Sequence, residues 1–299
     1  MQKLIPDNPR VLIQGITGKE GRRALSGMRA YGTNVVAGVT PGKGGEQIDG
    51  VLVFNTVKEA IDVAGPVNMI VQFVPPLLAL QATEEALAAG VPYLLVGAEK
   101  VPVHDALCMI AQAKETNAVL IGPGSVGMIV PHKQIKIGMI GGDTPTRAFT
   151  PGNIAILSKS GGMISEIAIH LKQHGLGASL ACGLGGERVS GSDFADLLTL
   201  LEQDERTHAS VIFGEIGGNA EERVAAALHA GHITKPVVAF VAGDFVSQLA
   251  IEAPFGHTGA ILEKNKHDAG EKRALLKDAG ALVAERFDDI AALLASALK

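Results

Sequence analysis

The sequence predicts an α/β protein built from two doubly wound domains. Its 299 residues are enough for two hydrophobic cores of ordinary size. Short β-branched apolar runs alternate with segments of helical periodicity along most of the chain. The 37 glycines and the aromatic content of only 4% suit helices that lie close to a sheet. This alternation predicts parallel strands joined by right-handed crossovers, with ligands bound at the carboxyl ends of the strands.

The first alternating series predicts a domain at residues 1–130. Strands are expected at residues 11–14, 34–39, 69–74, 93–96 and 119–121. Helices are expected at residues 21–30, 57–63, 78–89 and 103–116.

Residues 131–150 are rich in Gly, Pro and Thr and predict a linker before a second domain at residues 151–299. The second series predicts strands at residues 153–157, 179–183, 209–213, 237–241 and 282–284. It predicts helices at residues 163–174, 194–203, 220–230, 271–279 and 290–298.

Composition limits the classes of partner. The net charge of −5 comes from interspersed acidic and basic residues, which does not favour nucleic-acid binding. Cys108 and Cys182 lie in apolar settings without metal-ligand spacing, so we expect buried free thiols in a reducing compartment and no metal site. The sequence shows no signal peptide and no apolar stretch of about 18 residues. We therefore expect a cytoplasmic protein without a membrane partner.

A glycine-rich turn, Gly15-Ile16-Thr17-Gly18-Lys19-Glu20-Gly21, follows the first predicted strand and begins a helix. Its spacing differs from the Gly-x-Gly-x-x-Gly pattern of dinucleotide sites. Free backbone N–H groups and the positive end of the helix dipole still favour a phosphate there.

The second predicted strand distinguishes between ligands. A nicotinamide site has an acidic residue near this position, whereas this chain continues Val39-Thr40-Pro41-Gly42-Lys43-Gly44-Gly45. Lys43 favours an additional phosphate, as in coenzyme A or NADP. The alternative is that this segment is only a flexible turn.

A second anion site is predicted where the strand at 153–157 leads into Ser158-Lys159-Ser160-Gly161-Gly162. Ser160 is a candidate N-cap, and Gly161 and Gly162 expose the first N–H groups of a helix.

Two further residues complete a candidate catalytic set. Glu215 follows a predicted strand, where its carboxylate either orients an imidazole or caps the next helix. His257 lies in the small-residue segment Gly256-His257-Thr258-Gly259-Ala260-Ile261. Glycine allows close approach to a ligand, and a neutral imidazole nitrogen can attack a phosphoryl group. Together these features indicate phosphoryl transfer through His257.

Two other classes of function remain open at this point. An NADP-dependent oxidoreductase is disfavoured by the glycine spacing and by the lack of an evident proton donor. A non-catalytic CoA-binding regulator would not need Glu215 or the segment around His257.

These motifs resemble the α subunit of succinyl-CoA synthetase over nearly the whole chain. The resemblance rests on segments 15–21, 39–45 (VTPGKGG), 53–60 (VFNTVKEA), 121–127, 158–161, 214–218 (GEIGG) and 256–261 (GHTGAI). It implies a Rossmann-like CoA-binding domain followed by a flavodoxin-like domain.

The resemblance also implies roles for individual residues. His257 would be phosphorylated, with Glu215 as its partner. Residues that would contact CoA are Gly15, Thr17, Gly18, Lys19, Glu20, Lys43, Gly97, Ala98 and Glu99. Ser160, Gly161 and Gly162 would steady the phosphohistidine.

A partner is implied as well. ATP or GTP with Mg²⁺ would bind a separate ATP-grasp β subunit, in an αβ heterodimer or its dimer. The phosphoryl group would pass from the nucleotide to His257 and then to a carboxylate, and the CoA thiol would displace the phosphate.

Several residues depart from the succinyl-CoA synthetase pattern. Pro123-Gly124-Ser125-Val126-Gly127 stands where Pro-Asn-Cys-Pro-Gly is usual, and Gly162 and Ser165 stand where that family has threonine and tyrosine. Gly161-Gly162-Met163 and Phe255-Gly256-His257 resemble ATP-citrate lyase and citryl-CoA synthetase instead. The smaller residues predict an enlarged acid pocket, so the expected acid is citrate, malate or a sulfonated carboxylate rather than succinate alone. Without a cleavage domain, the expected activity is that of a ligase.

Overall fold

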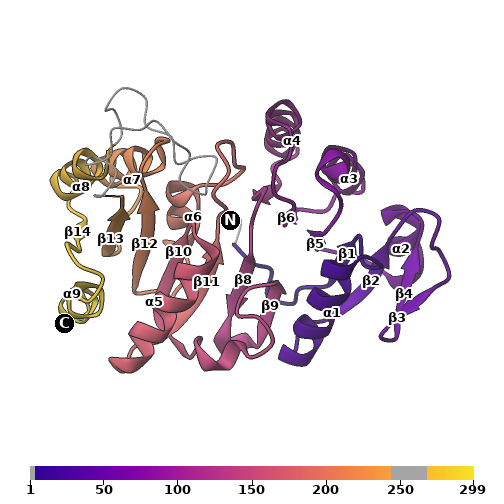
Figure 1. Ribbon diagram of the computed structural model, residues 1–299, viewed down its shortest axis with the longest axis horizontal. Helices are drawn as coiled ribbons and strands as arrows, with labels where there is room; N and C mark the ends of the chain where they lie inside the picture. Colours follow the sequence, from indigo (N-terminus) through magenta and orange to yellow (C-terminus); the bar gives the residue numbers. More distant parts are fainter. Residues whose placement is uncertain (1–3, 244–267) are drawn as a thin grey trace.

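The computed structural model describes residues 4–243 and 268–299. Two seven-stranded sheets lie side by side along the long axis of the molecule, with helices packed against both (Figure 1). This architecture confirms the α/β fold class.

The first sheet has the strand order β3-β4-β2-β1-β5-β6-β7 and is parallel except for β3. Its strands are β1 Val11–Gln14, β2 Val35–Val39, β3 Gln47–Ile48, β4 Val51–Phe54, β5 Met69–Gln72, β6 Tyr93–Val96 and β7 Val119–Ile121. Its helices are α1 Lys19–Tyr31, α2 Val57–Ala64, α3 Ala79–Ala88 and α4 Val103–Glu115, with a 3-10 helix η1 at Pro76–Leu78. Strand β1 lies between β2 and β5, which is the reversal of strand order where open α/β sheets bind ligands.

The second sheet has the order β14-β13-β12-β10-β11-β8-β9. Its strands are β8 Gly127–Val130, β9 Ile135–Gly138, β10 Pro151–Ser158, β11 Ala178–Gly183, β12 Ala209–Glu215, β13 Val237–Ala242 and β14 Leu282–Val283. Its helices are α5 Gly161–Gln173, α6 Phe194–Leu201, α7 Ala220–His229, α8 Ala269–Asp278 and α9 Asp289–Ala297, with 3-10 helices η2 Pro131–Lys133 and η3 Pro145–Arg147. Strands β10 to β14 pair in parallel with one another. Strand β8 pairs antiparallel with both β11 and β9.

The structure differs from the sequence prediction at the segment expected to be a linker. Strand β9 lies within residues 131–150 and pairs with β8, which pairs in turn with β11. Thr33 at the end of α1 also holds this strand, because its Oγ1 donates to the Lys136 carbonyl at 2.6 Å and accepts from the Lys136 N–H at 2.9 Å. The segment therefore joins the two sheets instead of separating them.

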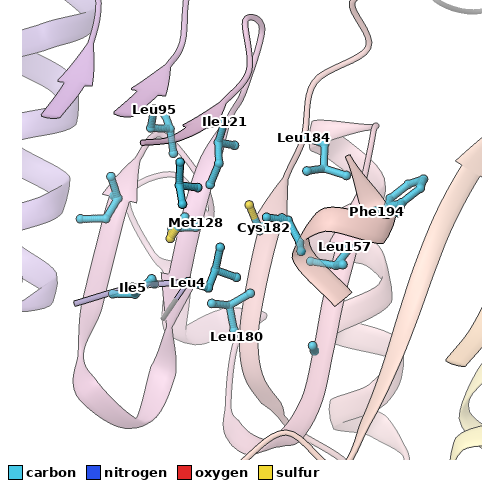
Figure 2. Packing of buried hydrophobic residues seen from close by; sticks show 14 of the residues in the cluster. Leu4, Ile5, Leu95, Ile121, Met128, Leu157, Leu180, Cys182, Leu184 and Phe194 are labelled. Atoms are coloured by element: carbon cyan, nitrogen blue, oxygen red, sulfur yellow. The ribbon is translucent and has the colours of Figure 1, made fainter. Parts of the chain in front are cut away.

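The apolar core is continuous across the two sheets. Leu95 and Ile121 of the first sheet belong to the same buried cluster as Met128 and Cys182 of the second (Figure 2). Burial raises the pKa of the Cys182 thiol to about 12, so this side chain serves packing and not nucleophilic chemistry. The burial predicted for Cys182 is confirmed, but Cys108 on α4 is only partly buried.

Candidate active site

The glycine turn after β1 packs closely against the end of β5. Gly15 has φ of +79°, and a Cβ at this position would collide with the Phe73 carbonyl oxygen. The Gly15 N–H donates to the Val39 carbonyl at 2.8 Å. Gly18 caps α1 without a side-chain hydrogen bond, so the N–H groups of Lys19 and Glu20 in the first turn have no intrahelical partner and suit an anion.

The loop that carries Lys43 is held by Asn55, which the sequence analysis did not single out. The Asn55 Oδ1 accepts hydrogen bonds from the N–H groups of Gly42 at 2.9 Å and Gly44 at 3.1 Å. The Lys43 side chain is about half exposed and lies 3.1 Å from Glu46. These contacts favour an ordered loop over a flexible turn. The sequence signals for Asn55 were its place directly after an apolar run and its position within the segment VFNTVKEA at 53–60.

Thr17 connects this loop to the glycine turn. Its Oγ1 donates to the Thr40 Oγ1 at 3.2 Å, and the two residues follow neighbouring strands β1 and β2. Residues Gly97 to Glu99 follow β6, where the Gly97 N–H donates to the Gln72 carbonyl at 3.0 Å. The turns predicted to bind CoA therefore lie at one edge of the first sheet.

A pocket of about 350 Å³ lies where this edge meets the second sheet. It brings Glu20, Gly97 and Glu99 together with Gly161 of α5. Its other lining residues are Phe73, Lys100, Gly124, Ser125, Val126, Met139, Lys159, Gly186 and Glu187. Lys43, Ser160 and Glu215 are not among them. The Lys100 N–H donates to the Glu187 Oε1 at 2.6 Å and so ties the two sides of the pocket together.

The second glycine turn opens α5. Ser160 is its N-cap, and the Ser160 Oγ accepts from the Met163 N–H at 3.4 Å, as the sequence predicts. Gly161 and Gly162 are exposed in the first helical turn. A Cβ on Gly162 would meet no atom within 4 Å among the described residues. Within the described part of the chain, the N–H group of Gly162 is therefore left accessible, as an anion site requires.

Glu215 is the last residue of β12 and is largely buried, with 9% of its surface exposed. Strand β12 lies between β10, which leads to Ser160, and β13. The N-cap position of α7 belongs to Asn219, so Glu215 does not take it. The turn after Glu215 lies close to Lys159, whose Nζ is 3.8 Å from where a Gly218 Cβ would be.

His257 lies outside the described residues. The backbone leads toward it from β13, whose Ala242 is paired in register with Glu215. Its phosphorylation and its contact with Glu215 stay predictions.

Two charged residues near Glu215 were missed by the sequence analysis. The Lys272 Nζ lies 2.5 Å from the Glu221 Oε2, and both side chains are fully buried. Lys272 shares a face of α8 with Ala269 and Leu276, which are also buried. The available sequence signal was a charged residue at a helical position where the periodicity calls for an apolar one.

Comparison with known proteins shows which family the chain resembles over nearly its whole length. Residues 7–100 match a CoA binding domain, and residues 151–297 match a succinyl-CoA ligase like flavodoxin domain. The α subunit 1 of an ADP-forming succinate–CoA ligase from Archaeoglobus fulgidus is 40% identical, with 96% of this chain and 95% of that protein covered. The chain belongs to the succinate–CoA ligase α-subunit family. Proteins of this family are acid–thiol ligases that act with a β subunit, which sets aside the oxidoreductase alternative.

Family members act on different acids. An ADP-forming sulfoacetate–CoA ligase subunit from Bilophila wadsworthia is 36% identical with both chains fully covered. The α subunit of a malate–CoA ligase from Methylorubrum extorquens is 38% identical, covering 95% of this chain and 94% of that protein. A Methanosaeta concilii ATP citrate lyase in complex with (3S)-citryl-CoA has a TM-score of 0.91 at 26% identity, covering 99% of this chain and 50% of that chain. This chain therefore spans about half the length of that lyase.

Two absences apply to the described part of the chain. None of its helices is long and apolar enough to cross a membrane. Residues 4–243 and 268–299 contain no cluster of three His, Cys, Asp or Glu side chains that could hold a metal ion.

The close approach at Gly15 predicts a difference between two glycine substitutions. Gly15 and Gly42 have φ values of +79° and +78°, but a Cβ on Gly42 would meet no atom of residues 4–243 or 268–299 within 4 Å. We expect Gly42→Ala to cost about 1–2 kcal/mol from backbone conformation alone. Gly15→Ala should cost more and weaken CoA binding, because the turn must shift. Urea unfolding and calorimetric titration with CoA measure both effects; equal losses in the two variants would contradict the packing argument.

Proposed function

We propose that this chain is the α subunit of a nucleotide-dependent acid–CoA ligase that works through a phosphohistidine at His257. The supporting observation is the pocket where the turns of the CoA-binding sheet meet the α5 N-terminus. A thiol held by the first sheet and an acyl phosphate held by the second would meet in this pocket. Proximity of this kind is a large part of catalysis for a two-substrate reaction.

CoA would be bound by the strand-end turns of the first sheet. The residues proposed for this role are Gly15, Thr17, Gly18, Lys19, Glu20, Lys43, Gly97, Ala98 and Glu99. Backbone N–H groups of the α1 turn would bind the diphosphate, and the Lys43 ammonium would bind a further phosphate. The Glu20 and Glu99 side chains line the same pocket as Gly161, so the thiol end of CoA would reach toward the second sheet.

The reaction would proceed in three balanced steps. The His257 imidazole nitrogen attacks the γ-phosphorus of ATP or GTP, and the nucleoside diphosphate leaves. A carboxylate oxygen of the acid then attacks the phosphorus, which frees the imidazole and gives an acyl phosphate. The CoA sulfur attacks the acyl carbon, which forms the thioester and releases inorganic phosphate.

Residues of the second sheet would support these steps. The Glu215 carboxylate would accept a hydrogen bond from one imidazole nitrogen and leave the other free as the nucleophile. The N–H groups at Ser160, Gly161 and Gly162 would bind the phosphoryl oxygens at the helix N-terminus.

The acid is proposed to be larger or more anionic than succinate. A Cβ on Gly162 would meet no atom of the described residues within 4 Å, and Lys159 is among the residues that line the pocket, so its ammonium would be available to attract a carboxylate or sulfonate. Relatives named for malate, sulfoacetate and citrate chemistry support this class. Citrate, malate and sulfonated acids are therefore the candidates, with succinate as the reference.

The nucleotide and Mg²⁺ would bind an ATP-grasp β subunit, in an αβ heterodimer or its dimer. We place the complex in the cytoplasm, where both nucleotide and CoA are available. The chain would divide into a CoA-binding domain at residues 1–130 and a ligase domain at residues 151–299; strands β8 and β9, at the end of the first range and in the segment 131–150 between them, belong to the second sheet.

Phosphorylation of His257 is tested by labelling the αβ complex with γ-labelled ATP or GTP. The wild type should acquire an acid-labile, base-stable label, and His257→Asn should lose it by at least about a hundredfold because the nucleophile is absent. His232→Asn, which replaces an exposed histidine, is the matched control and should label normally. Undiminished label on His257→Asn would overturn the proposed function.

Lys43 is expected to act on CoA alone. Lys43→Ala should raise KM for CoA about 1.4- to fivefold, as an exposed ion pair contributes about 0.2–1 kcal/mol. The rate of His257 labelling should stay unchanged, because Lys43 follows β2 of the first sheet and does not line the pocket that contains Gly161. Lys58→Ala removes another exposed, ion-paired lysine nearby and should leave KM unchanged. Equal effects of the two substitutions on KM would argue against the assignment of Lys43.

Acid preference is expected to depend on Gly162 and Ser165. Gly162→Thr combined with Ser165→Tyr should reduce the space beside the first turns of α5, where the acid is proposed to bind, and shift the kcat/KM ratio toward succinate by at least about tenfold. Steady-state assays with succinate, malate, citrate and sulfoacetate measure this shift. Wild-type turnover of succinate at a much higher kcat/KM than all other acids would refute the larger pocket.

A further inference from the structure

The buried ammonium of Lys272 holds the turn that follows Glu215. The Lys272 Nζ donates to three oxygens: the Glu215 carbonyl at 3.0 Å, the Gly217 carbonyl at 2.5 Å and the Glu221 Oε2 at 2.5 Å. An ammonium group has three protons, so all of its donors are used. The Glu215 carbonyl at the end of β12 and the Gly217 carbonyl in the turn after it therefore both point toward the Lys272 ammonium.

The other oxygen of Glu221 completes this arrangement. Its Oε1 accepts a hydrogen bond from the Glu215 N–H at 3.2 Å. Both backbone polar groups of Glu215 are therefore bound by a single ion pair. Gly214 leaves room for this contact, because a Cβ there would collide with the same Oε1.

Packing alone does not explain a buried ion pair at this position. Taking two charges out of water is costly, and apolar residues of similar volume often stabilise a protein as well or better. What apolar residues cannot do is bind the Glu215 N–H and the Glu215 and Gly217 carbonyls. The ion pair therefore orients the turn, which an apolar pair would leave with unbonded polar groups.

The two partners come from helices on either side of the segment that contains His257. Glu221 is in the first turn of α7, and Lys272 is the fourth residue of α8. Helix α8 begins at Ala269, and its N-cap Asp268 comes directly after residues 244–267. The ion pair thus ties the Glu215 turn to the helix that follows this segment.

We infer that Lys272 and Glu221 are positioning residues for the phosphoryl-transfer step: their ion pair sets the direction of the Glu215 side chain. The inference rests on the proposed role of Glu215. Because hydrogen bonds fix the backbone on both sides of Glu215, its carboxylate is already oriented for the imidazole before each turnover. Lys272 and Glu221 do not touch the reacting atoms in this arrangement.

A mutant cycle in the full αβ complex tests the inference. Glu221→Gln is made in the wild type and in Glu215→Gln, and the rate of His257 labelling by γ-labelled ATP is measured in single turnovers. We expect Glu221→Gln to slow labelling at least tenfold in the wild type and less than twofold in Glu215→Gln, because it acts through Glu215. KM for CoA should not change. The same factor in both backgrounds would overturn the inference, since a general loss of structure lowers both rates alike.

Two further variants separate positioning from stability. Lys272→Met/Glu221→Gln removes both buried charges and should regain most of the Tm lost in Lys272→Met, while labelling stays at least tenfold slow. Wild-type labelling in this double variant would show that the pair is only structural. Arg223→Met, on the same helix as Glu221, removes a partly exposed arginine that is paired with Asp193 and Asp196 at the start of α6, and it should label normally.

The inference and the proposed function fail in different ways. If the wild type acquires no label, or if His257→Asn keeps it, the proposed function fails. If labelling depends on His257 but Glu221→Gln has equal effects in both backgrounds, only the positioning role fails.

Discussion

The buried apolar contact between the two sheets is the constraint on which the candidate site depends. Leu95 and Ile121 pack in one cluster with Met128 and Cys182, so the strand ends of one sheet cannot move independently of the other (Figure 2). Burial of this kind favours a single arrangement, because displacing one side exposes apolar surface on both. The pocket that Gly97 and Gly161 line is formed by residues of both sheets, so its shape depends on how the two sheets are held together.

Local donors dominate the electrostatics of the pocket. Glu20, Glu99 and Glu187 line it together with Lys100 and Lys159, so its side chains carry no excess of positive charge. The whole chain is also acidic, with a net charge of −5. Anionic substrates must therefore be bound by main-chain N–H groups at helix N-termini and by individual lysines, which are short-range and directional. This arrangement suits a site that must release a charged product after each turnover.

Periodicity predicted the elements of the parallel core well. The strands expected at 11–14, 93–96 and 119–121 coincide with β1, β6 and β7. Strands β3, β4, β8 and β9 were missed, because short runs among Gly and Pro look like loops until a partner strand satisfies their backbone groups. All four residues of β9 are buried, Lys136 included, and a charge in so short a strand hides its apolar pattern.

The sequence by itself determined the fold class and the two glycine turns at strand ends, since these follow from local periodicity and from the backbone conformations that glycine allows. The family followed from the resemblance of several motifs in a fixed order along the chain. It also named Glu215, Ser160 and Gly161, although the placement of His257 against them stays a prediction. Only the tertiary structure showed that Asn55 holds the Lys43 loop and that Lys272 and Glu221 hold the Glu215 turn. Lys272 lies 51 residues from Glu221 in the chain. No local sequence pattern predicts such a pairing, because tertiary packing brings the two charges together. Each charge then depends on the other, since both are buried away from water.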